Sequence, residues 1–158
     1  QWPPGGQGRQ VVNSHLVLRV VSKLLIPLIV VFGLYVHFHG DYSPGGGFQA
    51  GTIIAAGVIL YALIFGVENA RKAAPPTFVK FLAAFGVLLY GGTGIVSFFM
   101  GMNYLDYDAL HPDLAHKTGQ HIGIILIEIG VLTTVFSVMM MIFYAFAGRA
   151  PDIPEEEW

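Results

Sequence analysis

Four long apolar segments constrain this chain more than any other feature of its sequence. They cover about residues 14–37, 47–66, 78–100 and 121–146, and most charged residues lie between or outside them. Only 11% of the residues are charged, against about 25% in a soluble domain, so an ordinary soluble core cannot account for them. Each segment is also long enough to cross a bilayer as a helix. The sequence therefore predicts an all-α integral membrane protein with four transmembrane helices.

The distribution of basic residues predicts the orientation of these helices. All of them except Lys117 would share one side of the membrane, and they are Arg9, Arg19, Lys23, Arg71, Lys72, Lys80 and Arg149. By the positive-inside rule that side is the cytoplasm, and both termini are expected there. The expected organisation is a flexible cytoplasmic tail over 1–12, a four-helix membrane domain over 13–147 and an acidic cytoplasmic tail over 148–158.

Several function classes are disfavoured by the residues present. Cysteine is absent, which excludes disulfides and thiolate chemistry. No basic stripe with interleaved aromatic residues appears, so no nucleic acid is expected as a partner. Five histidines are expected on the outer side: His37, His39, His111, His116 and His121. The last three are five residues apart, a spacing that does not stack ligands on one helix face. Neither a metal nor another cofactor is predicted. A histidine-metal membrane oxidase or hydrolase stays open as an alternative that metal analysis would decide.

The stretch His39–Ala56 changes from polar turn chemistry to a run of small apolar residues. Its first half contains the turn formers and glycines that let the backbone bend sharply. From there small residues recur every fourth position, which places them on one ridge of a helix. Such a ridge permits close helix packing and favours helical partners. The turn and packing motif consists of Pro44, Gly45, Gly46, Gly47, Phe48, Gly51 and Ala55.

The first and third segments carry features of helix ends and bends. Arg19 and Lys23 lie on one edge of the first segment, where they would snorkel to the inner headgroups or contact a partner. Pro27 removes a backbone donor inside the same segment and should kink it. The glycine cluster Gly91–Gly94 in the third segment allows a bend or very close packing.

Glu128 is the most informative single residue, because it is a carboxylate inside the fourth apolar segment. An intramembrane carboxylate costs several kcal/mol unless it faces protein, water or a cation. His121 precedes it by seven residues on the same helix face, near the predicted outer surface. One interpretation is a short route for a proton or Na⁺ past His121 to Glu128. The other is a protonated Glu128 that only hydrogen-bonds to a neighbouring helix.

Three motifs in order resemble the B subunit of the Mrp/Mnh multisubunit Na⁺/H⁺ antiporters. The most specific is H-G-D-Y-S-P-G-G-G-F-Q-A-G, which is similar to the family's H/R-G-x-x-x-P-G-G-G-F-x-x-G turn. It is preceded by L-x-L-R-x-V-x-x-x-L-x-P-L from Leu16 to Leu28 and followed by H-x-G-x-x-x-I-E-I-G-V from His121 to Val131. The resemblance extends from about His15 to Phe146.

This resemblance implies a multi-pass subunit of a bacterial inner-membrane complex, and not an enzyme. The complex exchanges cytoplasmic Na⁺, or in some members another cation, for external H⁺. Its about six other membrane subunits include ones similar to the proton-pumping subunits of respiratory complex I. Two alternatives remain open: a purely structural scaffold subunit of such a complex, or a subunit of a related membrane-bound hydrogenase. A stand-alone transporter is disfavoured, because no internal repeat is present.

Overall fold

The structure, a computed structural model, describes residues 7–40, 45–110 and 118–148. Its elements are α1 (Gln7–Phe38), α2 (Gly47–Phe65), α3 (Val67–Ala73), α4 (Pro76–Phe99), the 3-10 turn η1 (Tyr107–Leu110) and α5 (Thr118–Ala147). No strand occurs among the described residues, and the predicted all-α class is confirmed.

Four of these helices are long and apolar enough to cross a membrane. The candidate spans are Leu16–Phe38, Gly47–Phe65, Pro76–Phe99 and Thr118–Ala147, with mean hydropathies between 1.8 and 2.3. Only 11% to 28% of the residues in these apolar windows are buried within the chain itself. Side chains that are apolar on all sides and yet uncovered require lipid or other helices around them. The predicted four-span membrane fold is therefore confirmed.

The helix boundaries differ from the predicted ones where polar residues flank a span. α1 begins at Gln7 and not near residue 14, because the helix continues through polar residues that precede its apolar part. It also continues through Pro27, and the kink expected there stays a prediction. The connection after α2 contains the short helix α3, and α4 begins with Pro76, whose missing N–H is not needed in a first turn.

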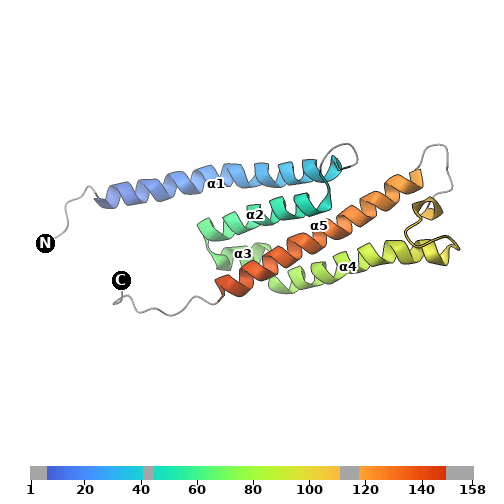
Figure 1. Ribbon diagram of the computed structural model, residues 1–158. Coiled ribbons are helices and arrows are strands. Elements are labelled where there is room, and N and C mark those ends of the chain that lie inside the picture. Colours follow the sequence, from blue (N-terminus) through green and yellow to red (C-terminus); the bar gives the residue numbers. More distant parts are fainter. Residues whose placement is uncertain (1–6, 41–44, 111–117, 149–158) are drawn as a thin grey trace.

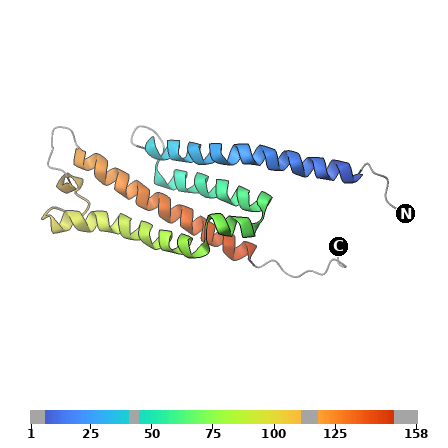
Figure 2. The same ribbon diagram turned by 180° about the vertical axis from the view of Figure 1, so that it is seen from behind.

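The spanning helices form a single layer in the order α1, α2, α5, α4 (Figure 1). α1 packs mainly against α2 at one edge, and α4 packs against α5 at the other. The view from behind shows the same order, with the start of α1 and the end of α5 at one end of the layer (Figure 2). The centre of the layer is thus the contact between α2 and α5, two helices that are distant in sequence.

Glycines bring the backbones of neighbouring helices into close contact. A Cβ on Gly86 of α4 would lie 2.8 Å from the carbonyl oxygen of Gly130 on α5. A Cβ on Gly51 of α2 would lie 2.8 Å from the carbonyl oxygen of Leu132. The ridge that begins at Gly47 therefore packs on α5 of the same chain. It was expected to favour partner helices, and the structure shows that an internal helix takes this place.

The connection after α4 folds back onto the ends of α4 and α5. The ring of Tyr104 covers Gly94, and the ring of Tyr107 covers Gly123. Burial raises the pKa of Tyr107, and the neighbouring Tyr90 and Tyr104 raise it further, so its hydroxyl stays neutral at physiological pH. Within the glycine cluster of α4, only Gly94 has this close contact. A Cβ on Gly91 or Gly92 would have no atom within 4 Å in the described part of the chain, apart from its own helix backbone and chain neighbours.

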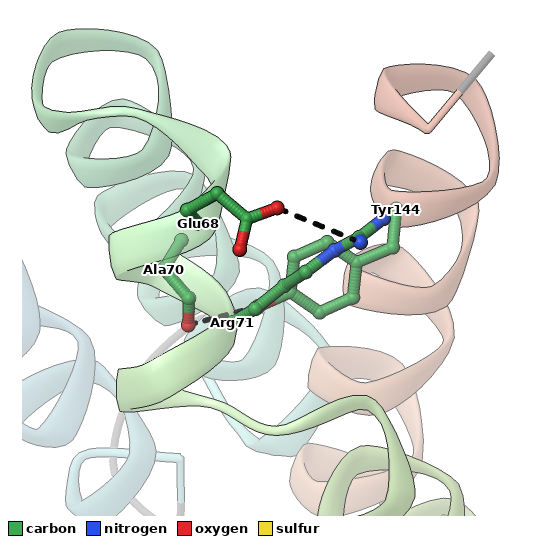
Figure 3. Close-up of polar contacts among 4 residues, drawn as sticks. All are labelled: Glu68, Ala70, Arg71 and Tyr144. Atoms are coloured by element: carbon green, nitrogen blue, oxygen red, sulfur yellow. Dashed lines mark hydrogen bonds and ion pairs between the residues drawn. The ribbon is translucent and has the colours of Figure 1, made fainter.

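The short helix α3 is fastened to the end of α5 by Tyr144. The Tyr144 hydroxyl lies 2.9 Å from the carbonyl oxygen of Ala74 and 3.2 Å from that of Ala70, to which it donates. Figure 3 shows the Arg71 side chain beside the Tyr144 ring, with its guanidinium carbon 5.9 Å from the ring centroid. A weak ion pair of 4.0 Å joins Arg71 to Glu68. The connection between the second and third spans is therefore held against the fourth.

Tyr144→Phe should weaken this attachment while keeping the ring in place. We expect a loss of about 1 kcal/mol of stability, the usual net value of one hydrogen bond, and more if the carbonyl groups of α3 stay dry. The midpoint of detergent-induced unfolding of the purified protein measures it. Tyr35→Phe is the matched control, since Tyr35 is 56% exposed on α1. Equal midpoints for the two variants would contradict the role of the Tyr144 hydroxyl.

Candidate functional site

The candidate site is centred on Glu128, which is half-buried in α5. Its carboxylate lies against the bare backbone of the glycine turn between α1 and α2. A Cβ on Gly40 would be 2.6 Å from Oε1 and 3.1 Å from Oε2, and a Cβ on Gly46 would be 3.1 Å from Oε1. A side chain at Gly40 would overlap the carboxylate, and one at Gly46 would be in tight contact with it. The turn and the intramembrane acid, which are about 80 residues apart in the sequence, thus form one site.

A backbone hydrogen bond holds the two ends of the turn together. The N–H of Gly46 donates to the carbonyl oxygen of Val36 at 3.3 Å and joins these ends, and the N–H of Gly40 donates to the carbonyl oxygen of His37 at 3.3 Å just after α1. Gly46 has a φ of +116°, a left-handed conformation that favours glycine. Pro44 lies outside the described residues. This closure brings the last turn of α1 and the first turn of α2 over Glu128.

The start of α2 fits closely against the backbone of Glu128. A Cβ on Gly47 would meet the carbonyl oxygen of Glu128 and would lie 3.0 Å from the backbone nitrogen of Leu132. Ala55, the third member of the ridge, is fully buried. Phe48 points away from this contact and is 63% exposed. The predicted ridge therefore positions the helix segment that carries the acid.

A small cavity of about 40 Å³ lies beside the carboxylate. Its lining residues are His37, Phe38, Ile125 and Glu128. His37 is only 4% exposed, and its Nδ1 atom has no hydrogen-bond partner among the residues that the structure describes. A buried imidazole and a carboxylate thus line one cavity at the end of α1.

The sequence interpretation did not place His37 in the site. It grouped this residue with the histidines of the outer side, because His37 stands at the end of an apolar segment and next to polar turn residues. The signal that could have found it is its position three residues before Gly40, in the last helical turn before the glycine motif. A side chain in that last turn can be covered by the chain that turns back from α1 to α2.

His121 lies near the start of α5, as the sequence placed it, and its part in an ion path stays a prediction. It is exposed near the start of α5, two turns before Glu128, or about 10 Å along the helix axis at 1.5 Å per residue. It does not belong to the lining of the cavity. The two residues share a helix face, as expected, but the group that accompanies Glu128 in the cavity is His37.

The basic residues of α1 lie at the opposite end of the layer from this site. Arg19 and Lys23 are both exposed. The Lys23 ammonium lies 5.8 Å from the centroid of the Phe65 ring at the end of α2, a distance at which a cation is attracted to an aromatic face. Their predicted role as anchors at the inner surface is compatible with this placement, and the side of the membrane stays a prediction.

The groups around Glu128 can bind a proton or a small cation. No cluster of three or more His, Asp or Glu residues that could hold a metal ion occurs within the described ranges. The cavity volume suffices for one water-sized occupant, since a water needs roughly 10–15 Å³ by the same measure. A carboxylate and an imidazole in such a place can exchange protons with a small occupant.

Comparison with known proteins identifies similar chains. Residues 17–141 match a family model described as a domain related to the MnhB subunit of Na⁺/H⁺ antiporters. Proteins of Staphylococcus haemolyticus (strain JCSC1435) and Staphylococcus aureus (strain Newman) are each 34% identical over 137 residues. These alignments cover 86% of this chain and 96% of each relative. The names of both relatives describe an antiporter subunit, mnhB2.

Proposed function

Because the chain belongs to the MnhB family of Na⁺/H⁺ antiporter subunits, we propose that it takes part directly in the exchange of cytoplasmic Na⁺ for external H⁺. It would do so as one subunit of a hetero-oligomeric complex in the bacterial inner membrane, with both termini in the cytoplasm. Its partners would be about six other membrane subunits, some of them similar to proton-pumping subunits of respiratory complex I. Glu128 is the residue that would carry a step of the ion or proton path.

One observation carries this proposal: Glu128 is an acid inside a spanning helix, and the backbone of the glycine turn lies against its carboxylate. An ionisable side chain within a membrane span is costly, and such residues typically face a polar route or a partner. Gly40 leaves room for the carboxylate, which a Cβ there would approach to 2.6 Å, and Gly46 allows an approach that a Cβ would tighten to 3.1 Å. A helix-packing role alone would be served equally well by an amide or a hydroxyl.

The end of the layer at which α1 ends would face the outside. The glycine turn, the start of α5 and the cavity all lie at this end. The distribution of basic residues predicts that this end is the outer one. His121, exposed at the start of α5, would receive protons from the external solution and pass them towards Glu128. Histidine suits this role because its ordinary pKa is close to neutrality.

Glu128→Gln and Glu128→Ala test this proposal in the assembled complex. We expect both variants to assemble, and to lose at least nine-tenths of the Na⁺-dependent proton flux per assembled complex across the pH range. The flux is followed with a pH-sensitive dye in everted membrane vesicles, and assembly by copurification of the partner subunits. Glu68→Gln is the matched control, since this carboxylate side chain is 85% exposed on α3 and should not affect antiport.

A structural scaffold is the second candidate function, and the close contact of α2 with α5 favours it. On that alternative, substitutions in the segment 45–51 abolish assembly, while Glu128 variants transport normally once they are assembled. Full antiport by both Glu128 variants at all pH values would establish the scaffold role and reject the path through Glu128.

A further inference from the structure

Three buried side-chain atoms lack a hydrogen-bond partner among the described residues, and one of them belongs to the candidate site. They are Nδ1 of His37, Nε of Arg71 and Oγ of Ser137. Leaving a buried polar atom unsatisfied costs about 1–3 kcal/mol, so such atoms are usually completed by water, an ion or a second group. Of the three, only His37 also lines the cavity beside Glu128.

The cavity has the size and the chemistry for one water molecule. It measures about 40 Å³, and two of its four lining residues are ionisable while Phe38 and Ile125 are apolar. A buried water needs two to four polar partners. The His37 ring, the Glu128 carboxylate and the nearby backbone of the glycine turn can supply them. A water there would be a hydrogen-bond partner for Nδ1 of His37, a side chain that is only 4% exposed.

The nature of the lining favours a proton over Na⁺ as the bound ion. Na⁺ is a hard cation and prefers oxygen ligands, whereas an imidazole nitrogen binds a proton near neutral pH. No Lys, Arg or Asp belongs to the lining. The other titratable groups on the adjoining segments are His39 just after α1 and His121 on α5, and α2 presents the neutral Gln49 near Gly46. Asp41 lies outside the described residues.

We propose that His37 and Glu128 form one proton-binding pair, bridged by a buried water and roofed by the glycine turn. When His37 is protonated, its Nδ1–H bond breaks and the proton passes to the water. The water at the same time gives one of its own protons to a Glu128 oxygen. The pair changes from imidazolium and carboxylate to neutral imidazole and carboxylic acid, so total charge and proton number are conserved. Proton entry and exit then occur at different members of the pair.

This inference rests on the proposed path through Glu128 and deepens it, since it names the second group and the ion. It also accounts for the glycines of the turn that lie against Glu128. A side chain at Gly40 would overlap the carboxylate, and at Gly46 the φ of +116° itself favours glycine.

His37→Asn tests the pair, because an amide can keep a hydrogen bond to the water and cannot titrate. The readout is the carboxyl infrared band of Glu128, assigned by its loss in Glu128→Gln and followed over a pH titration of the purified complex. Two groups that share a proton titrate as a coupled system. We therefore expect the midpoint of the band to move by about one pH unit or more in His37→Asn. The control His15→Asn, 22 residues earlier on α1 and thus about 33 Å away along the helix at 1.5 Å per residue, should leave the midpoint unchanged.

The outcomes separate the pair from the proposed function. An unchanged midpoint in His37→Asn overturns the pair, even where Glu128→Gln abolishes antiport. A shifted midpoint together with full antiport in Glu128→Gln supports the pair and rejects the transport role. A band that responds to added Na⁺ at constant pH, equally in wild type and His37→Asn, identifies a sodium site and overturns the proton pair.

Discussion

Gly47→Ala is expected to leave little assembled protein in the membrane. The new Cβ would meet the carbonyl oxygen of Glu128 and lie 3.0 Å from the backbone nitrogen of Leu132. Both atoms are backbone of α5, so neither can rotate away as the end of a flexible side chain does. Overpacking costs about 1–3 kcal/mol where the surroundings can relax, and here α2 would have to separate from α5. The amount of tagged subunit that copurifies with its partners measures the effect.

Gly57→Ala on the same helix is the control for this prediction. There the nearest atom to a new Cβ is Cγ2 of Ile29 on α1, at 3.3 Å, and a small side-chain movement can relieve it. Alanine raises helix propensity by up to about 1 kcal/mol in a helix interior, as at Gly57, and Gly47 is the first residue of α2, where this gain is smaller. We expect Gly57→Ala to assemble nearly as the wild type does. Equal assembly of the two variants would show that α2 and α5 do not approach as described.

Gly86→Ala should have the second largest effect, at the contact of α4 with α5. A Cβ there would meet the hydroxyl of Thr134 and would lie 2.8 Å from the carbonyl oxygen of Gly130. The Thr134 hydroxyl already donates to the Gly130 carbonyl at 2.7 Å, and that of Thr133 donates to Ile129 at 2.8 Å. These hydroxyls are therefore held in place. We expect the unfolding midpoint of the purified protein to fall by several degrees.

Gly91→Ala provides a control with the opposite sign. It lies on the same helix, and no atom of the described residues is within 4 Å of the new Cβ. The substitution then acts only through helix propensity, which favours alanine by up to about 1 kcal/mol. The midpoint should rise or stay constant. If the midpoint fell as far as in Gly86→Ala, the contact of α4 with α5 would not be the cause of the Gly86→Ala effect.

The spanning helices could be predicted from the sequence because hydrophobic length is a local property. All four were expected within a few residues, apart from the polar start of α1 and the seven-residue α3. A seven-residue helix is too short for a periodic pattern, and it depends on the remote contact of Tyr144 with Ala70 and Ala74. The glycine turn and Glu128 were also recognised as unusual from the sequence.

The pairing of helices could not be predicted, because periodicity identifies a face and does not say which helix covers it. Gly47 and Gly51 were expected to favour partners, and they pack on α5 of the same chain. His37 was interpreted as one of several outer histidines, since no local pattern indicates that a residue at a helix end lies under the following turn. The site results from a contact between segments about 90 residues apart, which only the fold brings together.

The layer order also has a consequence for how the site comes into existence during synthesis. α1 with α2, and α4 with α5, are two hairpins of consecutive helices, and the contact of α2 with α5 joins them. Helices of a membrane protein can insert first and associate afterwards. Until the second hairpin has been inserted, the glycine turn has no acid beneath it and His37 has no cavity. Glu128 in turn has no roof until the hairpins meet. The site is therefore among the last parts of the chain to form, and an incomplete chain in the membrane contains none of it.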